Sequence, residues 1–322
     1  MKKTVLVGSL ILATLGLSAC SGTGQDTEAG QSAQDGIGAT YAVVTHSGQG
    51  DAYWDRVKSG AEKAGEDYGA TVTYASDPDP AKQSQLIDNA VAQNVDGIVV
   101  SMANPDGLQA SVEKAVAAGV PVVTINSGME RSKEFGAFTH IGQSETVAGE
   151  AAGEEMNGSE FKKALCVIHE AGNVGHEERC RAAASVFDGT MENLQVDGTN
   201  DAEVKSTIKS KLQADPSIDS ILTMGAQFSL DAVGAVEETD SEASVMTFDL
   251  TEDVISGIQS GSILFAVDQQ PYVQGFLGVT ALYLNTINGN VIGGGEPVYS
   301  GPAFITKDNA DTVAEFAKNG TR

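Results

Sequence analysis

The sequence has few basic residues, few aromatic residues and only three cysteines. Lysine and arginine number 19 against 44 aspartates and glutamates, which gives a formal net charge of −25 at pH 7. This balance excludes nucleic-acid binding, which needs a basic surface to neutralise phosphates. Aromatic residues make up 6% of the chain but hydrophobic residues make up 41%, so there are enough apolar side chains to bury a core. The acidic surface otherwise favours solubility and does not identify a ligand.

The sequence also lacks the short motifs of covalent catalysis and of common cofactors. It has no Gly-x-Ser-x-Gly nucleophile elbow and no Cys-x-x-Cys pair. Gly48-Gln49-Gly50 half resembles a dinucleotide fingerprint, but Tyr53 takes the place of its third glycine. His169-Glu170 and His176-Glu177-Glu178 do not have the HExxH spacing of a zinc site. We therefore expect neither a cofactor nor a metal.

The N-terminal residues predict a lipoprotein signal peptide. Two lysines precede an apolar run from Val5 to Leu17, which is shorter than the ~20 apolar residues of a membrane-spanning helix. Leu17-Ser18-Ala19-Cys20 resembles a bacterial lipobox, in which the signal is cut before the cysteine and the thiol is acylated. We expect residues 1–19 to be removed, which changes the net charge to −27, and Cys20 to anchor the chain outside the cytoplasmic membrane. An ordinary signal peptide with an incidental cysteine is the alternative.

Residues 20–39 contain no aromatic residue and no apolar periodicity, so we expect a flexible tether. From Thr40 onward, short β-type runs alternate with amphipathic helical stretches. The first half has predicted strands at 41–45, 71–74, 97–101 and 121–125, and predicted helices at 54–68, 81–93 and 107–118. This alternation predicts βαβ units and a parallel sheet covered on both faces.

The same pattern repeats in the second half of the chain. Strands are predicted at 164–168, 219–223 and 245–248, with a helix at 177–187, and the length of the chain also suggests two domains. Polar residues follow matching strands: His46-Ser47 and His169-Glu170 follow the first strand of each half, and Asn126 and Asp249 follow later ones. Because ligands bind outside the carboxyl ends of parallel strands, we expect one cleft shared by both halves. Ordinary turn chemistry is the alternative for any single residue.

In order and spacing, several segments resemble the sugar-type periplasmic binding proteins of ABC importers, the ribose- and galactose-binding class. The segments are YAVVTHSGQGDAYW, DGIVVSMANPDGL, AGVPVVTINSG, HEERCR, VMTFD and DQQPYVQG, within residues 41–306. The resemblance implies an α/β fold of two Rossmann-like lobes with parallel sheets, joined by a three-strand hinge (a type I periplasmic binding protein). It implies an N-lobe of 40–142 plus 270–298 and a C-lobe of 143–269 plus 299–322. It also implies a monomeric, non-enzymatic receptor that delivers a monosaccharide or polyol to an ABC permease.

The resemblance further implies which residues bind the ligand. Ser47, Asp51, Tyr53 and Trp54 match a loop in which polar groups bond the sugar and aromatic rings stack on its apolar face. A core contact at the start of a helix is the alternative for the two aromatic residues.

Three further matches lie in the second half. Arg179 matches the arginine that clamps vicinal hydroxyls, Asp249 the carboxylate that accepts two hydroxyls, and Gln269 a hinge-side amide. A surface ion pair with Glu178 is the alternative for Arg179. We expect neither Arg179 nor Asp249 to belong to a core.

Two positions depart from the family pattern. Asn126-Ser127 stands where the ribose and galactose receptors typically carry an Asp-Arg or Asp-Ala type pair, and Gly225-Ala226 stands where an Asn or Asp usually follows the strand. Both changes remove charge or side-chain reach. We therefore expect Asn126 and Gly225 to line a pocket for a ligand other than ribose, enlarged at Gly225.

Cys166 and Cys180 remain once Cys20 is assigned to lipid. They fall in a predicted strand and in the helix that follows it, which are neighbours in a βαβ unit, so an oxidising compartment favours a disulfide. Two buried thiols are the alternative.

Two other functions stay open from the sequence. A signalling receptor for a sugar-like autoinducer would share the fold. A surface carbohydrate-active enzyme would need two carboxylates flanking a bond, and Asp51 and Asp249 are the candidates.

Overall fold

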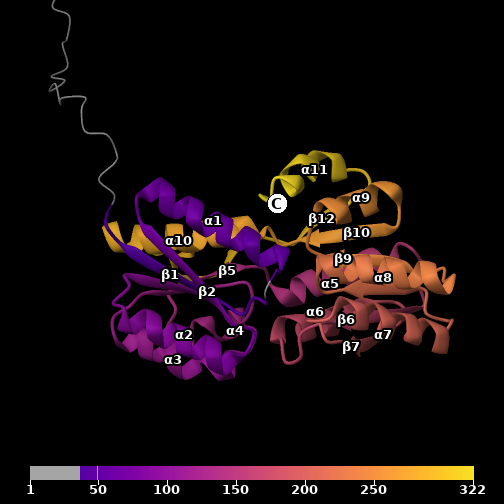
Figure 1. Ribbon diagram of the computed structural model, residues 1–322, viewed down its shortest axis with the longest axis horizontal. Coiled ribbons are helices and arrows are strands. Elements are labelled where there is room, and N and C mark those ends of the chain that lie inside the picture. The colour runs from indigo at the N-terminus through magenta and orange to yellow at the C-terminus, as the bar shows by residue number, and fades with distance from the viewer. Residues whose placement is uncertain (1–36, 49) are drawn as a thin grey trace, which may run out of the picture. The chain divides into compact units, whose positions relative to one another are not determined.

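The described part of the chain contains two six-stranded sheets, each with helices between successive strands (Figure 1). The computed structural model describes residues 37–48 and 50–322. The predicted signal peptide, Cys20 and most of the predicted tether lie outside these residues. The predicted fold class, α/β with two parallel-stranded lobes, is confirmed. Among the described helices, none combines the length and the apolar character needed to cross a bilayer.

The first sheet has the strand order β11-β5-β4-β3-β1-β2. Its strands are β1 (Thr40–Thr45), β2 (Thr71–Ser76), β3 (Gly97–Ser101), β4 (Val122–Ile125), β5 (Thr139–Gly142) and β11 (Val298–Tyr299). Its helices are α1 (Ala52–Tyr68), α2 (Pro80–Ala92), α3 (Pro105–Ala117), α4 (Met129–Ser132) and α10 (Pro271–Asn288). Figure 1 shows α1 and α10 on one face of this sheet and α2 and α3 on the other, with a separate apolar cluster on each face. Both faces of the central strands are therefore covered, which is why their sequences are nearly continuous runs of valine and isoleucine.

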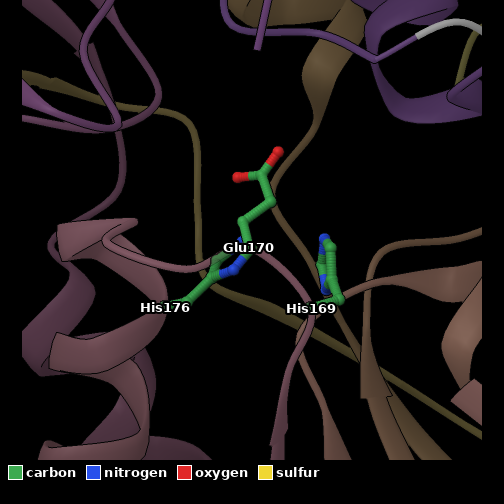
Figure 2. Close-up of side chains that lie close together, drawn as sticks. All are labelled: His169, Glu170 and His176. Atoms are coloured by element: carbon green, nitrogen blue, oxygen red, sulfur yellow. The ribbon is translucent and has the colours of Figure 1, made fainter. Parts of the chain in front are cut away.

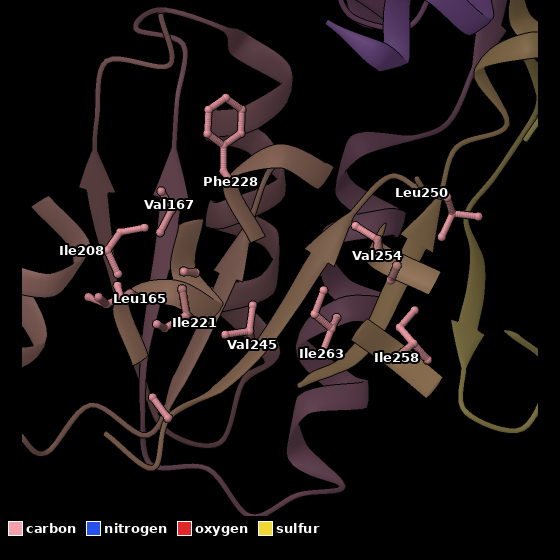
Figure 3. Close-up of a cluster of buried hydrophobic side chains, with 14 of the residues drawn as sticks. Leu165, Val167, Ile208, Ile221, Phe228, Val245, Leu250, Val254, Ile258 and Ile263 are labelled. Atoms are coloured by element: carbon pink, nitrogen blue, oxygen red, sulfur yellow. The ribbon is translucent and has the colours of Figure 1, made fainter. Parts of the chain in front are cut away.

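The second sheet has the equivalent order β12-β10-β9-β8-β6-β7. Its strands are β6 (Lys163–Ile168), β7 (Thr190–Gln195), β8 (Ser220–Thr223), β9 (Ser244–Phe248), β10 (Ile263–Asp268) and β12 (Ala303–Thr306). Its helices are α5 (Glu145–Asn157), α6 (Val174–Val186), α7 (Asp201–Ala214), α8 (Ala226–Thr239), α9 (Glu252–Ser260) and α11 (Ala310–Lys318). Figure 3 shows the larger of its two cores, in which strand residues such as Ile221 and Val245 meet helix residues such as Ile208 and Ile258.

A disulfide joins Cys166 of β6 to Cys180 of α6, with an S–S distance of 2.01 Å. These are the two cysteines that the sequence paired. The bond ties the first strand of the second sheet to the helix that follows it.

The chain passes from one sheet to the other three times: between β5 and α5, between β10 and α10, and between β11 and β12. A short 3-10 helix, Ile292–Gly295, precedes β11. The sixth strands differ in direction, because β11 is parallel to β5 whereas β12 is antiparallel to β10.

The two sheets also share their strand register. Tyr41 of β1 pairs with Gly97 of β3, and Ala164 of β6 pairs with Ser220 of β8 at the matching place. The same correspondence runs through β3–β4 and β8–β9. Three pairs of positions are therefore equivalent in the two lobes: His46 and His169, Ser101 and Met224, and Asn126 and Asp249.

Candidate ligand-binding site

Asn126 and Asp249 turn the chain away from the ends of β4 and β9 in the same manner. Both have left-handed backbones, with φ of 61° and 73°, a conformation that Asn and Asp tolerate better than most side chains. The Asn126 N–H donates to the carbonyl of Ile141 at 3.1 Å, and the Asp249 N–H donates to that of Val267 at 2.9 Å. Both side chains are buried. The two lobes thus present an amide and a carboxyl group at equivalent strand ends.

One chain of hydrogen bonds connects Asn126 to Asp249. Asn126 Nδ2 donates to the Tyr53 hydroxyl at 2.8 Å, and that hydroxyl donates to Gln274 Oε1 at 3.0 Å. Gln274 Nε2 donates to the carbonyl of Gln269 at 3.1 Å. The Gln269 side-chain amide in turn donates to Asp249 Oδ1 at 2.6 Å. We call these residues, together with Arg179, Glu145 and Gln143, the interlobe network.

Arg179 enters the interlobe network from α6. Its Nη2 donates to Gln269 Oε1 at 2.8 Å, and its Nε and Nη2 bind both oxygens of Glu145, at 2.5 and 2.9 Å. Gln143 Nε2 donates to the same carboxylate at 3.1 Å. The guanidinium carbon lies 4.8 Å from the centre of the Phe248 ring. This bidentate pair fixes the orientation of the arginine.

The alternative considered for Arg179, an ion pair with Glu178, and the expectation that it lies outside a core are both wrong. Its ion-pair partner is Glu145, at the start of α5, whereas Glu178 binds Arg181 and Thr146. Arg179 is also 1% exposed and Asp249 is 8% exposed, so both are buried residues of the lobe interior. Glu178 lies one residue away on the helix, and consecutive helical residues do not face each other.

Several buried polar atoms have no hydrogen-bond partner within the described residues. They include Arg179 Nη1, Gln143 Oε1, His169 Nδ1 and His176 Nδ1. Buried polar groups are normally paired, and an unpaired one costs about 1–3 kcal/mol. Arg179 and Gln143 therefore have a donor and an acceptor, at the edge of the interlobe network, that no other described residue uses.

The predicted loop after β1 is bonded mainly to itself. Asp51 Oδ1 accepts the backbone N–H of Tyr53 at 2.9 Å, and this N-cap starts α1 at Ala52, two residues before the predicted start. Ser47 Oγ donates to the carbonyl of Gly48 at 2.7 Å. Burial raises the pKa of Asp51 to about 6, although the helix-capping N–H groups oppose this shift. Neither side chain is bonded to the interlobe network in the part of the chain that the structure describes.

Tyr53 and Trp54 have different surroundings. Tyr53 belongs to the interlobe network through its hydroxyl, whereas Trp54 is 5% exposed and packs in the apolar cluster of the first lobe, with Val57 and Val279. The Trp54 ring meets the edges of His46 and Tyr53, at centroid distances of 4.6 and 5.0 Å. A core contact thus describes Trp54, and its stacking on a ligand stays a prediction.

The space beside Gly225 is filled. A Cβ atom on Gly225 would come within 3.1 Å of His169 Cε1 and 3.2 Å of the Phe228 ring, and these two rings stack with centroids 3.9 Å apart. The expected enlargement of the pocket at Gly225 is therefore not present, because a histidine and a phenylalanine occupy the volume. A hollow of about 380 Å³ on the second lobe is lined by His169 together with Gln195 and Glu203.

The charges around the interlobe network are mostly negative. Burial raises the pKa of Asp249 to about 7, against the opposing effects of Arg179 and the Gln269 amide. Burial and the charge of Arg179 lower the pKa of His46 to about 3, so its 3.8 Å contact with Glu170 is not an ion pair at neutral pH. Arg179 is already paired with Glu145, so the site offers little net attraction to an anion.

The structure also brings together residues for which the sequence spacing predicted no site. Single donor atoms of His169, Glu170 and His176 all lie within 4.8 Å of one another. In Figure 2, His169 comes from the end of a strand and His176 from the start of a helix. The HExxH spacing rule does not detect this proximity, because it describes two histidines on one helix.

Sequence reasoning missed Glu145, Gln143 and Gln274. Glu145 lies 34 residues before Arg179, and Gln274 lies 221 residues after Tyr53, so neither contact leaves a local pattern. The one available signal was position, since Gln143 follows β5 as Gln269 follows β10.

Comparison with known proteins places the chain in a family. Residues 41–289 match the model of the periplasmic binding protein domain. A solved structure of a carbohydrate transporter from Acidothermus cellulolyticus 11B, in complex with myo-inositol, is 43% identical in sequence and has a TM-score of 0.87. The match covers 88% of this chain and 100% of that chain. The ribose import binding protein of Bacillus subtilis is 25% identical over 291 residues (87% of this chain, 92% of that protein). The xylitol-binding protein of Mycolicibacterium smegmatis is 24% identical over 253 residues (76% and 70%). The family model spans most of both lobes, and the chain therefore belongs to the periplasmic binding protein domain family.

Proposed function

We propose that the protein is an extracytoplasmic solute receptor, which captures an uncharged cyclic polyol or monosaccharide between its lobes and delivers it to an ABC permease. The observation that carries this proposal is the interlobe network, which joins Asn126 and Tyr53 of the first lobe to Asp249 and Arg179 of the second. A molecule held there would touch both lobes and so favour their closed arrangement.

The chemistry of the interlobe network suits hydroxyl groups. A hydroxyl both donates and accepts a hydrogen bond, and the network offers amides, a phenol, a carboxyl group and a guanidinium. An anionic ligand would instead meet Asp51, Glu170 and Asp249, with the charge of Arg179 already balanced by Glu145. Neutral ligands are therefore favoured over phosphorylated or acidic sugars.

The relatives support a polyol ligand. The 43% identical structure holds myo-inositol, and another relative is named for xylitol. Asn126, which stands where the ribose and galactose receptors typically carry an aspartate, agrees with a ligand other than ribose. We therefore favour a cyclic polyol of the inositol type.

In this proposal the N-lobe (40–142 plus 270–298) and the C-lobe (143–269 plus 299–322) close by bending at the three crossings. The proposed ligand-binding residues are Ser47, Asp51, Tyr53, Asn126, Arg179, Gly225, Asp249 and Gln269. Trp54 packs in the core against Tyr53, so of the predicted residues it would contact the ligand least. The protein acts as a monomer without catalysis, tethered outside the membrane through lipid on Cys20.

A ligand panel tests the proposal. Thermal unfolding is followed with myo-inositol, xylitol, ribose, glucose, glucuronate and an inositol monophosphate, and each positive result is checked by titration calorimetry. We expect myo-inositol or another neutral cyclic polyol to stabilise the fold, by about 2.7 kcal/mol at a hundredfold excess over Kd, and the two anions to have no effect. Absence of stabilisation by every neutral sugar and polyol would contradict the proposal.

Two other functions predict different outcomes. A signalling receptor for a sugar-like autoinducer would respond to that molecule and not to common polyols. A carbohydrate-active enzyme would release product from aryl glycosides, and replacing Asp51 or Asp249 would stop the release. We expect no turnover.

A further inference from the structure

His169, Glu170 and His176 form a compact group of metal-ligating side chains beside, but separate from, the interlobe network. One donor atom of each lies within 4.8 Å of the others (Figure 2). Among the described residues, none of the three side chains is hydrogen-bonded to Arg179, Gln269 or Asp249. We call this group the His-Glu-His cluster.

Both imidazoles of the cluster have a nitrogen that lacks a partner. The Nδ1 atoms of His169 and His176 are buried and unbonded within residues 37–48 and 50–322. The equivalent histidine of the first lobe, His46, is bonded through Nδ1 to Ser101 Oγ at 2.7 Å. Met224 stands at the position equivalent to Ser101, so the second lobe has no hydroxyl there to satisfy His169.

The surrounding residues hold the cluster in place. Asn173 Nδ2 donates to Glu170 Oε2, while Asn173 Oδ1 accepts the backbone N–H groups of Gly175 and His176 at 3.0 and 3.2 Å. One asparagine thus orients the carboxylate and also caps the helix that carries His176. Outer-shell hydrogen bonds of this kind orient the ligands of metal sites.

Charges of both signs surround the cluster: burial and the charge of Arg179 lower the pKa of His169 and His176, and that positive charge disfavours a cation, whereas nearby carboxylates favour one. Arg179 is the charged base that acts on these residues, and it is neutralised by its bidentate pair with Glu145. Asp51 lies close enough to Glu170 for the two carboxylates to repel each other. A bound cation would relieve that repulsion.

We propose that His169, Glu170 and His176 bind a divalent cation of the zinc class, with His46 as a fourth ligand from the other lobe. His46 Nε2 already lies 3.8 Å from Glu170 Oε2, and its Nδ1 bond to Ser101 orients that nitrogen toward the cluster. Two or three imidazoles and a carboxylate suit zinc, nickel or copper, whereas magnesium and calcium prefer oxygen ligands. Since His46 belongs to the first lobe, the ion would link the two lobes at the edge of the proposed polyol site, which Glu170 also faces.

The test is equilibrium dialysis of zinc chloride against the chelator-treated, untagged full chain. A Cys20→Ser background prevents the predicted acylation and leaves no cysteine outside the disulfide. The variants are His169→Gln, His176→Gln, Glu170→Gln and His46→Gln, and Glu177→Gln is the matched control, because Glu177 is exposed and adjacent to the cluster. The visible spectrum with cobalt substituted for zinc reports the ligand geometry directly, and thermal melting shows which variants are folded.

We expect one zinc ion per chain and a tetrahedral cobalt spectrum. The His169→Gln and His176→Gln variants should bind zinc more than about 100-fold more weakly, beyond the ~10–100-fold typical of a lost outer-shell partner. His46→Gln should weaken zinc binding less than His169→Gln or His176→Gln does. Glu177→Gln should leave the zinc affinity unchanged. Failure of the wild-type chain to bind zinc, nickel or copper stoichiometrically would overturn the proposal. Binding that persists unchanged in the folded His169→Gln and Glu170→Gln variants would also overturn it.

Discussion

The two lobes place a histidine at the same point of the same fold, and only one of the two has a hydrogen-bond partner there for Nδ1. Ser101 Oγ accepts a hydrogen bond from the backbone N–H of His46 at 3.1 Å, and it lies 2.7 Å from His46 Nδ1. In the second lobe Met224 takes the equivalent position, and Nδ1 of His169 is unpaired among the described residues. The equivalent residues Asn126 and Asp249 also differ, because Asn126 carries a neutral amide and Asp249 carries a buried, ionisable carboxyl group. His46 and Asn126 are therefore bonded within the first lobe, whereas His169 of the second lobe has a nitrogen that no described residue bonds; elsewhere in the first sheet, His140 Nε2 is also unpaired among the described residues.

The largest expected loss of stability comes from breaking the buried Arg179–Glu145 pair of the second lobe, compared with removing the neutral Asn126 amide of the first lobe. Arg179→Ala leaves Glu145 buried without its partner, which should lower the free energy of unfolding by about 3–5 kcal/mol. Asn126→Ala removes one amide from the neutral lobe and should cost about 1–3 kcal/mol. Urea unfolding of both variants measures the difference. Equal losses would show that the buried Arg179–Glu145 pair of the second lobe contributes no more than the Asn126 amide of the first lobe.

Trp54 tests the apolar part of the first lobe. Its burial in the core predicts that Trp54→Ala lowers the free energy of unfolding by about 3–5 kcal/mol, and that Trp54→Phe lowers it less. Because Trp54 is the only tryptophan, its fluorescence reports this core alone. We expect a blue-shifted emission that changes little when ligand binds. A large, saturable quench would instead favour stacking of Trp54 on the ligand.

Asp249 makes the second lobe sensitive to pH. Its folded-state pKa of about 7 lies above the ordinary value of 3.8, so the folded state retains a proton that the unfolded chain has lost. Stability from this group is therefore greatest below about pH 4, declines as the pH rises to about 7, and is constant above. At about 1.36 kcal/mol per pKa unit, the decline is at most about 4 kcal/mol.

Asp249→Asn should remove this decline, and Asn126→Asp is the matched change in the first lobe. Thermal unfolding between pH 4 and 8 measures both. If wild type and Asp249→Asn show parallel curves, Asp249 does not titrate in this range. Polyol affinity should also rise with pH through about 7 if the ionised carboxyl group accepts the ligand hydroxyls.

The smallest effect concerns Ser101. Ser101→Ala removes the hydroxyl partner of His46 Nδ1, so that His46, like His169, has an unpaired nitrogen. This should lower the free energy of unfolding by about 1–3 kcal/mol. Equilibrium unfolding measures this cost, with Ser84→Ala, on α2, as a control for loss of a part-buried serine hydroxyl. No loss beyond the control would mean that the contrast between the lobes has no energetic consequence.

The fold was predictable from the sequence because it rests on local periodicity. Valine-rich runs alternate with amphipathic helices, and the predicted ends of those elements mostly lie within two or three residues of the observed ones, as for β1 and α1. Tyr53, Asn126, Arg179, Asp249 and Gln269 were predicted from family resemblance and strand ends, and hydrogen bonds bring all five together. Glu145 was not predictable, because it lies on another helix, 34 residues from Arg179. Gln274 lies in the quoted segment DQQPYVQG, five residues after Gln269, but its bond to Tyr53 spans 221 residues and leaves no local pattern. The filling of the space beside Gly225 depends on how His169 and Phe228 pack, which no local pattern specifies.

A crystal structure grown with the neutral polyol that binds tightest in the panel tests the central claim most directly. We predict one molecule between the lobes, bonded on one side to Asn126 or Tyr53 and on the other to Asp249 and to Arg179 Nη1. A molecule that contacts one lobe alone, or that occupies the hollow beside Gln195 and Glu203, would contradict the account.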